Sequence, residues 1–184
     1  LLKRYEVKSY FHSDVESDNS IDDEIRRILE EKRIPSAILT RGHRIDFRDG
    51  ASFDVLYPEA GAKAGDTNAL SIVGALSYGS TTVLFTGDAP SSVERRIVSL
   101  DAANVFAQIL KVGHHGSKTS SSEEFLQSVS PQYAVISSGA GNRYKHPSEE
   151  TLLRLKKQGI TVLRTDMLGT IRIVLGRDSI SLGN

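Results

Sequence analysis

Three short apolar segments, each followed by a loop with glycine and polar side chains, constrain the fold of this chain most. The segments and their loops are 81–86 before Gly87-Asp88, 109–112 before Gly113-His114-His115-Gly116, and 133–137 before a Gly/Asn loop that leads to His146. Their β-branched and apolar composition predicts strands, and segments of helical pattern separate them. Strands that alternate with helices indicate a mixed α/β fold, in which strand ends assemble functional sites.

The rest of the pattern agrees with an α/β fold. Residues 1–5 resemble the end of a helix, and Ser20 and Ser121 are predicted to cap helices at 21–32 and 122–129. Further helices are predicted from Pro90-Ser91 to Ser99 and from Ser148 to Gln158. Further strands are predicted at 7–11, 37–39, 44–47, 52–57, 71–77, 162–165 and 170–175. The length of 184 residues suits a single domain, which we place at 1–184.

The composition says more about which metal ligands the chain can offer than about which molecules it binds. Lysine plus arginine and aspartate plus glutamate each total 23, so the formal net charge is zero. Binding to DNA would therefore need a local basic patch or a metal. The absence of cysteine excludes disulfides and thiolate metal ligands. No apolar run approaches the roughly 20 residues of a membrane helix, and no signal peptide opens the chain.

Asp88, His114, His115 and His146 follow three neighbouring predicted strands and form the candidate site. Imidazole and carboxylate groups bind divalent ions such as Zn or Mn, and a carboxylate can bridge two ions. Such a pair makes hydroxide at neutral pH and stabilises in-line displacement at phosphorus. Gly113 and Gly116 favour this interpretation, because they permit a backbone that brings the imidazoles close to another loop.

Each candidate also has a purely structural interpretation. Asp88 could cap the helix that begins near Pro90, and His146 with its following proline could start a helix. His114 and His115 could be loop residues without a partner. The two other histidines, His12 on a short strand and His43 in a turn, are predicted to be structural.

The motifs LFTGD, KVGHHGSKTSS and NRYKHP resemble the C-terminal domain of ComEC-type DNA-uptake competence proteins. They are also similar to stand-alone hydrolases of that branch of the metallo-β-lactamase superfamily. The resemblance runs from Asn68 to Ile173 and implies an αββα sandwich with two divalent ions, Zn or Mn. It implies that Asp88 bridges the metals, that His114 or His115 faces the metal or the phosphate, and that His146 is a ligand or an acid. Asn68, Ser117, Lys118 and Ser120 would lie beside the site and hold an anionic substrate.

One departure from the family pattern affects the expected site. The first metal motif of the superfamily, a His-x-His-x-Asp-His or His-x-Asp-x-Asp-His run, does not occur in this sequence. In the family this motif is followed by a segment similar to LLKRYEVKSYFHS, with which this sequence opens. We therefore expect the chain to begin just after the motif. The N-terminal strands would then be lacking, metal binding would be weak, and a sheet edge would be exposed.

The leading hypothesis is a metal-dependent phosphodiesterase or nuclease linked to DNA uptake. A second hypothesis keeps the fold and replaces DNA by a small phosphodiester or a lactone, which the zero net charge slightly favours. A third is a non-catalytic domain that docks on a membrane channel domain of the parent protein and carries a vestigial site. A competence role would place the site on the extracytoplasmic face of a membrane; a stand-alone hydrolase would be cytoplasmic or secreted.

Overall fold

A computed structural model describes residues 1–14 and 20–183 and contains one large mixed sheet. Its strands, in spatial order, are β3 (Arg44–Asp46), β4 (Ser52–Tyr57), β5 (Val73–Tyr78), β6 (Thr81–Phe85), β7 (Ile109–Lys111), β8 (Tyr133–Ile136) and β9 (Thr161–Arg164). Pairing is antiparallel from β3 to β6 and parallel from β6 to β9. The predicted α/β class is therefore confirmed, and β6, β7 and β8 are parallel neighbours.

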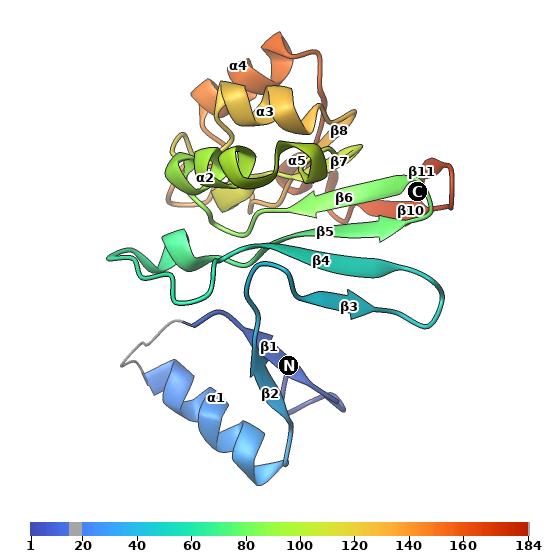
Figure 1. Cartoon of the computed structure of the whole chain (residues 1–184). Helices are drawn as coiled ribbons and strands as arrows, with labels where there is room; N and C mark the ends of the chain where they lie inside the picture. Colours follow the sequence, from blue (N-terminus) through green and yellow to red (C-terminus); the bar gives the residue numbers. More distant parts are fainter. Residues whose placement is uncertain (15–19, 184) are drawn as a thin grey trace.

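Three helices cover one face of this sheet: α2 (Ser91–Asp101), α3 (Glu123–Val129) and α4 (Glu149–Lys157). Figure 1 shows them together on one side of β6, β7 and β8. Alternate residues of the strands face the helices and are almost fully buried, as the period of two in a strand requires. The sheet side of this core includes Leu84, Leu110, Val112, Ala134 and Ile136, and the helix side includes Val93, Ile97, Phe125, Leu126 and Leu155.

The two ends of the chain form smaller units. Strands β1 (Tyr10–His12) and β2 (Ser36–Ile38) form a parallel pair, and helix α1 (Ser20–Glu31) lies between them in the sequence. Figure 1 shows this unit in blue beyond β3 and β4. The predicted apolar face of α1 is buried at Ile28 and Leu29, whereas Ile21 remains exposed. At the other end, β10 (Arg172–Leu175) and β11 (Ile180–Gly183) form an antiparallel hairpin.

Several predicted boundaries are wrong for identifiable reasons. Residues 1–5 form one hydrogen-bonded turn onto the Leu1 carbonyl, not a helix end. Ser71 lies outside β5, because it follows the 3-10 helix η1 (Thr67–Leu70). The short helix α5 (Thr165–Leu168) and strand β11 were not predicted, because four residues are too few to show a clear apolar period.

Ser121 does not cap helix α3, contrary to prediction. Its backbone is left-handed, with φ of 56°, and Ser122 occupies the N-cap position without a side-chain bond. The capping group comes from helix α2 instead: the Glu94 carboxylate accepts the N–H groups of Ser121 and of Ser122. Glu94 is 1% exposed, and this burial raises the pKa of its carboxyl against the opposing effect of the two N–H donors.

Within the residues that the structure describes, no helix is long and apolar enough to cross a membrane.

Candidate functional site

The predicted site residues come together at the ends of the parallel strands. Asp88 follows β6, His114 and His115 follow β7, and His146 follows β8. The backbone N–H of His114 donates to the Gly87 carbonyl, which joins the first two loops directly. The ring centroids of His114 and His146 are 5.8 Å apart, and His115 Nε2 lies 3.8 Å from Asp88 Oδ1. Three strand ends thus converge on one cluster, as the sequence predicts.

The two adjacent histidines adopt a left-handed backbone conformation. His114 has φ of 47° and ψ of 45°, and His115 has φ of 56° and ψ of 23°, within the 3-10 segment η3 (Gly113–Gly116). This conformation costs an L-residue roughly 1–2 kcal/mol, so the surrounding contacts must hold it in place. Local strain of this kind is common where side chains are aimed at a ligand.

The flanking glycines explain how this loop approaches its neighbours. A Cβ on Gly116 would lie 2.6 Å from Pro147 Cβ, so only glycine fits against the residue that follows His146. A Cβ on Gly113 would lie 3.1 Å from Thr86 Oγ1, at the end of β6. The predicted reason for the two glycines, close approach to another loop, is confirmed.

A hydrogen bond orients the His115 ring. Its Nδ1 lies 2.7 Å from the Ser137 carbonyl oxygen, which can only accept, so Nδ1 carries the hydrogen. The lone pair of a neutral ring is then on Nε2, the atom that faces Asp88. This arrangement matches metal-binding histidines, whose second nitrogen commonly donates to a backbone carbonyl.

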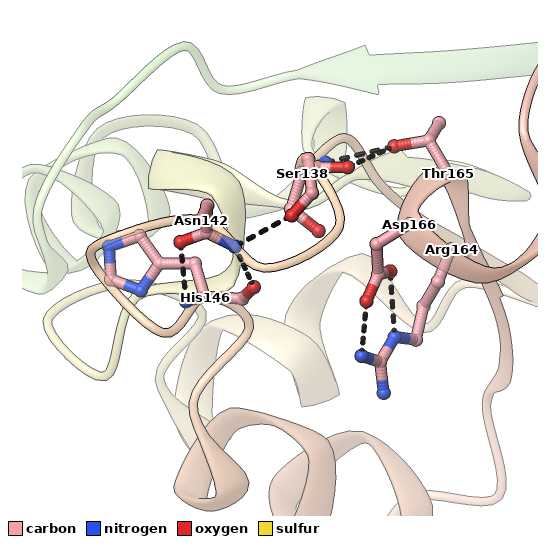
Figure 2. A network of polar contacts seen from close by, with 7 residues as sticks. Ser138, Asn142, His146, Arg164, Thr165 and Asp166 are labelled. Atoms are coloured by element: carbon pink, nitrogen blue, oxygen red, sulfur yellow. Dashed lines mark hydrogen bonds and ion pairs between the residues drawn. The ribbon is translucent and has the colours of Figure 1, made fainter.

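A loop anchored by Asn142 positions His146, as Figure 2 shows. The Asn142 side chain accepts the His146 N–H through Oδ1 and donates through Nδ2 to the carbonyls of Gly139 and His146. His146 Nδ1 is buried and has no hydrogen-bond partner among the described residues. Desolvation, then the nearby His114 and His115, lower the pKa of the His146 imidazole, which favours its neutral, ligand-competent form.

The predicted substrate-binding residues have different environments. Lys118 is exposed, whereas Ser117 and Ser120 are buried. The Ser117 hydroxyl bonds that of Thr119, and the Ser120 hydroxyl donates to the Ala89 carbonyl. Asn68 lies in η1, where its backbone N–H donates to Asp66. A direct contact with substrate stays a prediction for all four.

The structural interpretation of Asp88 as a helix cap does not agree with the structure. Pro90 is the N-cap of α2, and no side chain caps that helix end. The Asp88 carboxylate is 41% exposed and faces His115, while its backbone N–H donates to Ser71 Oγ. His146 does not start a helix either, because Ser148 is the N-cap of α4 and its hydroxyl accepts the Thr151 N–H.

Sequence reasoning did not assign roles to three groups that shape the site. Ser71 holds the Asp88 backbone, Asn142 fixes the loop before His146, and the Ser137 carbonyl sets the His115 ring. Asn142 stands four residues before His146 inside the NRYKHP motif, a spacing that could have indicated its anchoring role. A backbone carbonyl leaves no signal in the sequence.

The chemistry of these nitrogen and oxygen ligands suits a divalent ion. The 3.8 Å between His115 Nε2 and Asp88 Oδ1 is below the sum of typical Zn–N and Zn–O bonds, about 4.2 Å, so one ion can contact both. The Nδ1 of His146 is a further nitrogen without a hydrogen-bond partner, and it is buried, whereas the His115 and Asp88 side chains are 50% and 41% exposed. Nevertheless, no three His, Asp or Glu groups among residues 1–14 and 20–183 are arranged to hold an ion by themselves. Other groups would have to complete the coordination.

Comparison with known proteins identifies the family of the chain. The sequence profile described as "Metallo-beta-lactamase superfamily" matches residues 2–140, which is most of the chain. The chain belongs to the metallo-β-lactamase superfamily. The match includes Asp88, His114 and His115, whereas His146 lies beyond its end.

Three characterised relatives are similar to most of the chain. The chain is 43% identical to "Competence protein ComA" of Neisseria gonorrhoeae over 132 residues, 72% of this chain and 19% of that protein. It is 36% identical to "ComE operon protein 3" of Bacillus subtilis over 172 residues, 94% of this chain and 22% of that protein. "Recombination protein 2" of Haemophilus influenzae is 35% identical over 133 residues, 72% of this chain and 16% of that protein. The predicted resemblance to ComEC-type proteins is confirmed, and the chain spans about a fifth of these relatives.

Proposed function

We propose that this chain carries the site of a metal-dependent phosphodiesterase, with DNA as its substrate, in a competence-related protein. The observation that supports the proposal is the convergence of Asp88, His114, His115 and His146 from three adjacent strand ends. The names of the relatives, competence and recombination proteins, favour a nucleic-acid substrate linked to DNA uptake. Those relatives are about four times as long as this chain and so have room for further domains. A membrane channel domain and an extracytoplasmic location also belong to the proposal.

In this proposal each residue acts through the geometry described above. Asp88 and His115 would hold a divalent Zn or Mn ion, or the nearer ion of a pair, and Ser137 keeps His115 in the ligand tautomer. A divalent ion supplies a nucleophile at neutral pH and offsets charge at the phosphorus. His146, whose ring neighbours that of His114, would complete the set as a ligand or donate a proton to the leaving oxygen.

Hydrolysis assays of Asp88→Asn test this proposal. The protein is incubated with Mn²⁺ or Zn²⁺ and either DNA or bis(p-nitrophenyl) phosphate. We expect the substitution to lower the rate by about a hundredfold or more, because the neutral amide is a weak ligand. Glu150→Gln, an exposed carboxylate at the start of α4, is the matched control and should retain the rate. DNA that stays intact at high protein concentration, with Mn²⁺ and also with Zn²⁺, would contradict the nuclease proposal.

A substrate panel separates DNA from smaller substrates. Hydrolysis of bis(p-nitrophenyl) phosphate or of a lactone, without cleavage of DNA, would favour the small-substrate hydrolase. The zero net charge of the chain agrees with this alternative, because long polyanions are usually bound by clustered lysine and arginine.

A second candidate is a non-catalytic docking domain with a vestigial site. It is favoured by one observation, that the described residues include no three groups arranged to hold a metal ion. Metal analysis of the purified protein after incubation with Zn²⁺ or Mn²⁺ and dialysis discriminates the candidates. A vestigial site retains no metal above the Asp88→Asn variant, whereas a hydrolase site retains it in a fixed ratio.

A further inference from the structure

The loop before His146 presents an exposed aromatic ring next to the site. The Tyr144 and His146 rings lie 5.9 Å apart and nearly parallel, at 17°. The Arg143 guanidinium carbon lies 4.7 Å from the Tyr144 ring centroid, and Arg143 also donates to the Tyr144 hydroxyl. Tyr144 is nevertheless 63% exposed. The rings of His146 and Tyr144 and the Arg143 guanidinium thus lie against one another, and the core does not account for the tyrosine.

The loop is anchored, so the ring is held in place rather than free to move. Asn142 binds both ends of the loop through its side chain and accepts the Lys145 N–H through its carbonyl. Immediately after the loop, the Ser148 N–H donates to the Gly116 carbonyl. An aromatic ring held in a fixed position binds a planar ligand with less loss of entropy than a mobile one.

The basic residues of this loop lack the carboxylate partners that several arginines elsewhere among the described residues have. Arg41, Arg44, Arg96 and Arg164 are all paired with carboxylates. Arg143 and Lys145 are exposed, and no ion pair joins either to a carboxylate in the part of the chain that the structure describes. Lys118 on the neighbouring loop is exposed as well. Although the chain is neutral overall, this rim of the site therefore offers unpaired cations beside an aromatic ring.

We propose that Tyr144, flanked by Arg143 and Lys145, is a stacking platform for an unpaired nucleobase of a single-stranded nucleic acid. The base would take the place of the Arg143 guanidinium on the exposed ring. The inference rests on the proposed function and specifies its substrate class. Exposed aromatic rings bind single strands by stacking on the bases, and neighbouring cations contact the phosphates. A base inside a duplex is already stacked on its neighbours, so the platform would discriminate against double strands.

Binding without cleavage tests the platform. Fluorescence anisotropy with a labelled 12-nucleotide oligothymidine and with a 12-base-pair duplex, both in EDTA, measures affinity independently of any metal. We expect Tyr144→Ala to weaken single-strand binding roughly tenfold and to leave duplex binding unchanged. Tyr144→Phe keeps the ring and should restore the affinity. Tyr5→Ala removes a tyrosine of equal exposure, 64%, in the N-terminal turn and should have no effect.

The phosphate contacts have a separate measurement. The slope of log affinity against log salt should become shallower by roughly 0.7 in Lys145→Gln, the value for one lost contact on a single strand. Lys8→Gln, an exposed lysine near β1, is the control and should keep the slope.

Three results would overturn the platform: unchanged single-strand affinity in Tyr144→Ala, an equal loss for single strand and duplex, or no recovery in Tyr144→Phe. These results are distinguishable from failure of the proposed function, because loss of hydrolysis in Asp88→Asn is measured with metal present. A protein that hydrolyses DNA but shows unchanged binding in Tyr144→Ala keeps the function and loses the platform.

Discussion

At the scale of single residues, the left-handed backbone of His114 and His115 goes against the conformational preference of these residue types. Glycine adopts φ near 47° without steric cost, yet the chain places imidazoles at positions 114 and 115. The side chain of His114 contacts the rings of His115 and His146. The backbone strain therefore occurs at the same residues whose imidazoles form the ring cluster.

We expect His114→Gly to raise the free energy of unfolding by about 1 kcal/mol, because the left-handed strain is removed. His114→Ala keeps the Cβ and should not stabilise the chain. The matched control is Ser130→Gly, whose φ of 47° and ψ of 51° lie at the end of α3, far along the chain from the site. Urea unfolding measures all three variants. If His114→Gly is less stable than wild type, the imidazole contributes more to folding than the strain costs.

At the scale of elements, the fit between the η3 loop and Pro147 depends on the missing side chain of Gly116. An alanine there would face both an unfavourable φ of 82° and a Cβ contact of 2.6 Å. Gly159, at the end of α4, has a φ of 70° and no atom within 4 Å of an added Cβ. A comparison of alanine at position 159 with alanine at position 116 therefore separates the cost of the unfavourable φ from the cost of the Cβ contact.

Gly159→Ala should therefore destabilise the chain by about 1 kcal/mol, and Gly116→Ala by about 2–4 kcal/mol, since the second variant also separates two packed loops. Thermal unfolding monitored by circular dichroism measures both. Equal losses in the two variants would mean that the loops can shift apart at no cost.

Glu94 links helix α2 to the start of α3 and makes the link sensitive to pH. Burial raises the pKa of its carboxyl above the ordinary value of 4.5. The folded state therefore holds the proton more tightly, so this stability is complete below pH 4.5 and is lost as pH rises through the folded pKa.

Relative to Glu94→Gln, wild type should thus become less stable as pH rises from about 4 to 7. Replacing the carboxylate by an amide also changes the free energy of unfolding by an amount that does not depend on pH. Urea unfolding of both proteins across this range measures the difference. A wild-type advantage that grows with pH would show that the two N–H donors outweigh desolvation.

At the scale of the whole molecule, the sequence predicts the arrangement of elements better than the contacts that complete the site. The strand ends at Asp88, at His114 and at His146 could be predicted, because apolar period and glycine position are local signals. The Ser137 carbonyl that orients His115 and the Glu94 cap could not, because each pairs groups distant in the chain. Ser121 misled the prediction, since a capping residue type is local evidence and the actual cap comes from another helix.

Metal binding should stabilise the whole fold, because its candidate ligands come from loops after three different strands. Ligation only in the folded state adds about 2.7 kcal/mol when free metal is about 100 times Kd. For a chain of this size, that corresponds to a rise in Tm of roughly 5–10 °C. We expect Zn²⁺ or Mn²⁺ to produce this rise in wild type and not in Asp88→Asn, as measured by differential scanning calorimetry. An equal rise in both would place the ion elsewhere, and no rise in wild type would favour the vestigial site.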